Sequence, residues 1–172
     1  MTFNPNILSP TVKPQDKDRL AAAIAYIRQR RNAQAFLLLS AKELEQHSAA
    51  RFALGLCHLQ AADLSAAIAC FEQALRLLKT LSATLPAALE NGETYLKLAE
   101  KQIEDKVYLT PMDADFCEQF PKVAEQTVTL ALIDAYLQKD MPEQAQRLLA
   151  GLTGTAFAAY KQKLLENNSI KS

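Results

Sequence analysis

The feature that most constrains this chain lies between residues 48 and 81, where small and apolar residues recur at the spacing of two antiparallel helices. Five positions carry the pattern: Leu54, Gly55, Ala67, Phe71 and Ala74. Gly55 and Ala67 are small where the helices would cross, and Leu54 and Phe71 fill the space between them. A single hairpin of this kind cannot bury its apolar face alone, so it must stack on neighbours. The pattern predicts an all-α fold of stacked antiparallel hairpins.

These positions resemble the tetratricopeptide repeat (TPR) family, whose helical hairpins are about 34 residues long. The sequence departs from the family at three places: Arg51 replaces the usual Trp, His58 the usual Tyr and Lys79 the usual closing Pro. The resemblance implies a short TPR-like right-handed superhelix, closed by a C-terminal capping helix. It also implies a binding scaffold.

Two further copies flank this hairpin, of which the first is degenerate. Tyr26 and Ala35 are spaced like His58 and Ala67, and Ala67 follows Ala35 by 32 residues. The third copy is carried by Leu132, Tyr136, Ala145 and Leu149. Because Ala145 follows Ala67 by 78 residues, two periods of about 34 leave about 10 residues for an insert.

The length of 172 residues favours one domain. Residues 1–14 contain three prolines and few periodic apolar positions, so we expect an extended N-terminal arm followed by a helical-repeat domain over 15–172. Within the domain we predict hairpins over 16–46, 48–81 and 122–152, a helix over 87–104, an irregular insert over 105–121 and a capping helix over 155–166.

Charge and cysteine content exclude several classes of protein. Nineteen basic residues balance nineteen acidic ones, so no bulk positive field exists to hold nucleic acid. No apolar run approaches the ~20 residues that span a bilayer, and the N-terminus lacks a basic region followed by an apolar stretch. Cys57, Cys70 and Cys117 are odd in number and widely spaced, which favours reduced thiols over disulfides. We therefore expect a cytoplasmic protein with no membrane span.

The first helix of each tetratricopeptide hairpin lines the concave face, so the resemblance places a protein-binding groove there. The corresponding positions are Phe52, Ala53, Leu56, Leu59, Leu130, Ala131, Asp134 and Leu137. An unpaired carboxylate would lose its hydration in so apolar a groove, which excludes the family's carboxylate clamp. We expect the groove to bind an apolar helix or extended segment of a protein partner. Coverage by the chain's own arm, insert or last helix, or by a second copy in a homodimer, is the alternative.

The insert is too apolar for an ordinary solvated loop. Its large apolar residues are Tyr108, Leu109, Met112, Phe116, Cys117 and Phe120. We expect it to fold back onto the helices, and a contact surface is the alternative.

Residues for catalysis or metal binding are few. His47 and His58 lie eleven residues apart, which does not suit a helical metal pair. Asp113, Asp115 and Glu118 resemble the start of a calcium loop but lack the glycine that such a loop needs. We predict no catalytic, cofactor or metal site, and hence a non-catalytic protein–protein interaction module.

Two other functions stay open. The length, the three repeats and the stretch from Arg51 to Phe71 also resemble the chaperones of bacterial type III secretion, which shield secreted or translocator proteins. A metal-dependent regulator or enzyme using the 105–121 insert would require Asp113, Asp115, Glu118 or Cys117 to converge with His58.

Overall fold

The structure is a computed structural model that describes residues 13–83 and 105–152, together with residues 101, 103, 157, 158 and 162. Residues 1–12 of the expected arm, and nearly all of the expected helix over 87–104 and of the capping helix over 155–166, lie outside the described residues. The first described helix begins at Pro14, inside the predicted arm, because proline is well suited to the first position of a helix.

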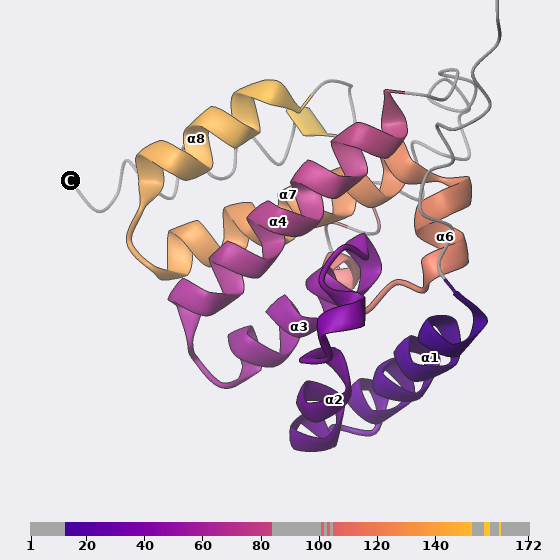
Figure 1. The fold of residues 1–172 in the computed structure, drawn as a ribbon. Coiled ribbons are helices and arrows are strands. Elements are labelled where there is room, and N and C mark those ends of the chain that lie inside the picture. Colours follow the sequence, from indigo (N-terminus) through magenta and orange to yellow (C-terminus); the bar gives the residue numbers. More distant parts are fainter. Residues whose placement is uncertain are drawn as a thin grey trace, which may run out of the picture.

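The regular elements of the described residues are all helices, with no strand, in agreement with the predicted all-α class (Figure 1). Consecutive helices form three antiparallel hairpins: α1 Pro14–Arg28 with α2 Asn32–Leu39, α3 Ser48–Gln60 with α4 Leu64–Ser82, and α7 Pro121–Gln138 with α8 Pro142–Gly151. A 3₁₀ turn η1, Lys42–Leu44, connects the first two hairpins. A second 3₁₀ turn η2, Val107–Leu109, and a short helix α6, Ala114–Gln119, precede the third hairpin.

The three hairpins share one turn geometry. Arg30, Ala62 and Asp140 each adopt a φ of 59°, in the left-handed region, two residues after the first helix of the pair ends. In each turn the next residue's N–H donates to the carbonyl five residues back: Arg31 to Tyr26 at 2.8 Å, Asp63 to His58 at 2.9 Å and Met141 to Tyr136 at 2.9 Å. This is the Schellman arrangement, which satisfies carbonyls at a helix C-terminus. The turns recur at offsets of 32 and 78 residues, the same offsets that separate Ala35, Ala67 and Ala145 in the sequence.

The crossing of α3 and α4 forms the centre of the core. Leu54, Ala67, Phe71 and Ala74 are buried there, as the spacing of small and apolar residues predicts. A Cβ atom added to Gly55 would lie 2.5 Å from the Phe71 ring, so only glycine fits this crossing. The Phe71 ring in turn packs against Phe52, with ring centroids 5.5 Å apart.

The hairpins stack through neighbouring helices. Helix α2 packs on α3, and α4 packs along α7, which lies behind it in Figure 1. The hydroxyl of Tyr136 in α7 donates a hydrogen bond of 2.5 Å to Glu72 in α4. The second hairpin therefore contacts the third directly, although residues 83–120 separate them in sequence.

The insert folds back onto the hairpins, as its composition predicts. Tyr108, Met112 and Cys117 are buried, η2 and α6 pack on α7, and α6 also packs on α3. The expectation of an irregular insert is wrong for residues 114–119, which form α6. The helix begins because the Asp113 side chain accepts the Phe116 N–H at 2.7 Å, and it ends at Phe120, where the following proline disfavours helical geometry.

Candidate binding surfaces

The predicted groove residues divide into two groups. Phe52, Leu56 and Leu130 are 0%, 2% and 1% exposed, so their side chains belong to the core. Leu59, Asp134 and Leu137 are half-buried and keep part of their surface accessible. A partner in this groove would therefore contact the second group, toward the C-terminal ends of α3 and α7.

The insert contacts the two helices that carry the predicted groove residues. Helix α6 lies on α3, and η2 lies on α7, where the Lys106 ammonium group is 3.6 Å from the Asp134 carboxylate. The insert thus packs on the first helices of the second and third hairpins, which are the helices to which the predicted groove residues belong.

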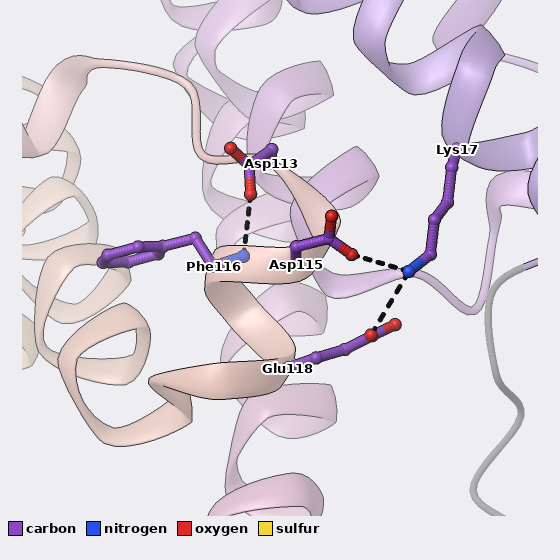
Figure 2. Close-up of polar contacts among 5 residues, drawn as sticks. All are labelled: Lys17, Asp113, Asp115, Phe116 and Glu118. Carbon is purple, nitrogen blue, oxygen red and sulfur yellow. Dashed lines mark hydrogen bonds and ion pairs between the residues drawn. The ribbon is translucent and has the colours of Figure 1, made fainter.

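Ionic contacts attach α6 to α1 (Figure 2). The Lys17 ammonium group donates to Asp115 at 2.6 Å and lies 3.4 Å from Glu118. The hydrogen bond to Asp115 is the main reason why the pKa of Lys17 is raised. These contacts connect α6 to the first hairpin, while α6 also packs on α3 and α7.

The acidic residues that resembled a calcium loop have other contacts. Asp113 caps α6, while Asp115 and Glu118 pair with Lys17. Throughout the part of the chain that the structure describes, no group of three or more His, Cys, Asp and Glu side chains could hold a metal ion.

The two histidines lie in different surroundings. His47 precedes α3, and its Nε2 is 4.0 Å from a carboxylate oxygen of Asp16, with both side chains mostly buried. His58 stands edge-on to the Phe36 ring at 5.4 Å, and its Nδ1 is 3.5 Å from Asp63. The contacts of His58 are thus with α2 and its own hairpin turn, whereas Asp115 and Glu118 contact α1.

The three cysteines are buried free thiols. Burial raises the pKa of Cys57 to about 11 and that of Cys117 to about 12, and it also raises the pKa of Cys70. At neutral pH all three carry their proton, and a protonated thiol is a poor nucleophile and metal ligand. They pack as small apolar side chains, as the sequence suggests.

A pocket of about 410 Å³, which the sequence pattern does not predict, lies between α4, α7 and α8. The residues that line it are Leu75, Lys79, Lys122, Glu125, Gln126, Thr129, Arg147, Leu148, Gly151 and Leu152. The pocket exists only because α4 packs on α7, a contact between residues far apart in the chain. The sequence signal for this pocket is a set of basic residues on three helices. The helical periodicity of the apolar residues does not predict that these basic residues lie close together.

A small apolar surface lies on α2. Leu37 is 74% exposed and Phe36 is 40% exposed, next to the His58 ring. Isolated exposed apolar residues are common on soluble proteins, so these two alone do not define a binding site.

No helix within the described ranges is long and apolar enough to cross a membrane. In comparisons with known proteins, the chain matches no family model, no curated protein and no solved structure.

Proposed function

We propose that this chain is a non-catalytic protein-recognition module, a short tetratricopeptide-like stack that binds an apolar helix or extended segment of a partner protein. The partner lies on the face formed by α3 and α7. The three equivalent hairpin turns, at offsets of 32 and 78 residues, support a repeat architecture of this kind.

The insert is the observation that carries the proposal. It lies on α3 and α7 with Tyr108, Met112 and Cys117 buried, while Asp115 and Glu118 face Lys17 at the surface. An apolar segment with a polar outer side is thus complementary to this face. Recognition of an amphipathic segment in a helical groove is a common mode of peptide binding.

The partner binds beside the insert and does not displace it. Burial of each large apolar side chain of the insert contributes about 1.5–3 kcal/mol, so removal of Tyr108 and Met112 from the face would cost several kcal/mol. The surface left to the partner is the half-buried group of Leu59, Asp134 and Leu137.

Affinity purification from the native cell tests this function with three variants. Leu59→Glu and Leu137→Glu each place a carboxylate on the proposed face, whereas Leu37→Glu makes the same change on the exposed surface of α2. We expect the two groove variants to lose about tenfold or more in affinity for the retained partner, because a buried unpaired carboxylate loses its hydration. The Leu37→Glu variant should bind like the wild type.

Circular dichroism and thermal unfolding of each variant are the controls that test whether the fold persists. If the partner is retained by Leu59→Glu and Leu137→Glu but lost by Leu37→Glu, the proposed face is wrong. Light scattering measures the molar mass of the purified chain and so shows whether the partner is a second copy. A dimer that uses this face should dissociate in the Leu137→Glu variant.

A further inference from the structure

The pocket between α4, α7 and α8 is lined by both apolar and basic side chains. Leu75, Leu148 and Leu152 supply the apolar part. Lys79 from α4, Lys122 from α7 and Arg147 from α8 bring positive charge from three separate helices. This pocket is distinct from the α3 and α7 face that carries the proposed function.

The pocket carries excess positive charge in a chain that is neutral as a whole. Glu125 is the one carboxylate among its lining residues, and it accepts a hydrogen bond of 3.0 Å from the Ser82 hydroxyl. Lys79 and Arg147 form no ion pair with any described residue. Lys79 and Arg147, set against one engaged carboxylate, favour an anionic ligand.

The size of the pocket sets the scale of that ligand. A volume of about 410 Å³ falls within the size range of small-molecule sites. Inorganic phosphate would make no apolar contact with the three leucines, and a plain hydrocarbon would make no ionic contact with the cations.

We propose that this pocket binds a small organic carboxylate with an apolar tail. The tail packs against Leu75, Leu148 and Leu152, and the carboxylate binds near Lys79 and Arg147. The Arg147 guanidinium can bind both carboxylate oxygens at once, which a lysine cannot do.

Four probes test the two halves of this recognition by calorimetric titration of the full chain. Octanoate carries both the charge and the tail, octanol lacks the charge, inorganic phosphate lacks the tail, and octylammonium reverses the charge. We expect octanoate to bind with a Kd of about 1 mM or tighter, and each of the other probes at least about tenfold more weakly. Octanol binding as tightly as octanoate, or no measurable binding of octanoate, overturns the proposal.

Two variants locate the site. Arg147→Gln removes a pocket cation, and Arg76→Gln removes an exposed cation of α4 that does not line the pocket. We expect Arg147→Gln to weaken octanoate binding about tenfold and Arg76→Gln to leave it within about twofold. Equal losses in the two variants overturn the assignment to this pocket. Neither outcome depends on the partner-binding face, because Leu137→Glu tests that face separately.

Discussion

Gly55 shows how a single missing side chain determines the distance between two helices. An added Cβ would lie 2.5 Å from the Phe71 ring, which is fully buried and packed against Phe52. A side chain at position 55 would therefore force this packed ring to shift. Glycine is unfavourable in a helix interior, so its presence here reflects the close crossing of α3 and α4.

We predict that Gly55→Ala lowers the free energy of unfolding by about 1 kcal/mol. Overpacking a core costs about 1–3 kcal/mol, and the better helix propensity of alanine returns about 1 kcal/mol. Gly151→Ala is the matched control, because nothing lies within 4 Å of a Cβ at that position, and its effect should stay within about 0.5 kcal/mol. Urea unfolding measures both, and a Gly55→Ala variant more stable than the wild type would contradict the close crossing.

A second residue-scale prediction concerns the turn of the central hairpin. Ala62 has a φ of 59°, which costs a residue with a side chain about 1–2 kcal/mol. Ala62→Gly should relieve this strain and raise the free energy of unfolding by about 0.5–1 kcal/mol, after the larger chain entropy of glycine is subtracted.

The neighbouring Ala61 is the control for this prediction. Its φ is −82°, which any residue adopts easily, so Ala61→Gly should destabilise the protein by about 0.5–1 kcal/mol. Opposite signs for these two adjacent substitutions are the expected result in chemical denaturation. The same sign in both would show that the left-handed turn is not the source of the effect.

At the scale of elements, the insert behaves as part of the core and not as a surface loop. Tyr108 and Cys117 are each 2% exposed, and they connect η2 and α6 to the hairpins. The ionic contacts of Lys17 lie at the surface and will weaken with salt, so the apolar contacts stabilise the docked insert more than the charges do.

We predict that Tyr108→Ala lowers the free energy of unfolding by about 3 kcal/mol, as expected for truncation of a large buried aromatic side chain. Hydrogen exchange over residues 105–120 should become faster at the same time, because the insert opens locally. Val107→Ala is the matched control in the same 3₁₀ turn, since Val107 is 45% exposed and should change stability by less than about 0.5 kcal/mol. Unchanged exchange in the Tyr108→Ala variant would mean that the insert is held by other contacts.

At the scale of the whole molecule, three buried acids couple stability to alkaline pH. Burial raises the pKa of Cys57 from 9.0 to about 11, and that of Cys117 from 9.0 to about 12. Burial, followed by the hydrogen bond to Glu72, raises the pKa of Tyr136 from 10.0 to about 12. The unfolded chain therefore releases these protons at a lower pH than the folded chain.

We predict that this stabilisation is fully present below pH 9 and is lost progressively between pH 9 and about 12. In that range the folded state binds more protons than the unfolded state, so stability falls as pH rises. Thermal unfolding at a series of pH values measures the slope, and the double variant Cys117→Ala Tyr136→Phe should show a shallower decline than the wild type. The slope is the informative quantity, because the substitutions also change stability at neutral pH. Equal slopes would mean that other groups control alkaline unfolding.

How well a feature of this protein could be predicted depends on how far apart in the sequence the contacting residues lie. The all-α class and the central hairpin follow from the sequence, because the spacing of Leu54, Gly55, Ala67 and Phe71 reflects contacts within a helix or between adjacent helices. The buried nature of the insert was also predictable from its apolar composition. Its helix α6 was not, because six residues are too few for a clear helical period and the decisive signal is one capping aspartate.

The binding surfaces depend on longer-range packing. The sequence determined which helices pair, since the short turns allow only antiparallel neighbours. It did not determine that α4 packs on α7 or that the insert lies on α3 and α7, because these contacts join residues on either side of a segment of about forty residues. The tertiary structure alone therefore decided which predicted groove side chains are buried and where the basic pocket forms: local sequence fixes the faces of each helix, but only packing decides which faces meet.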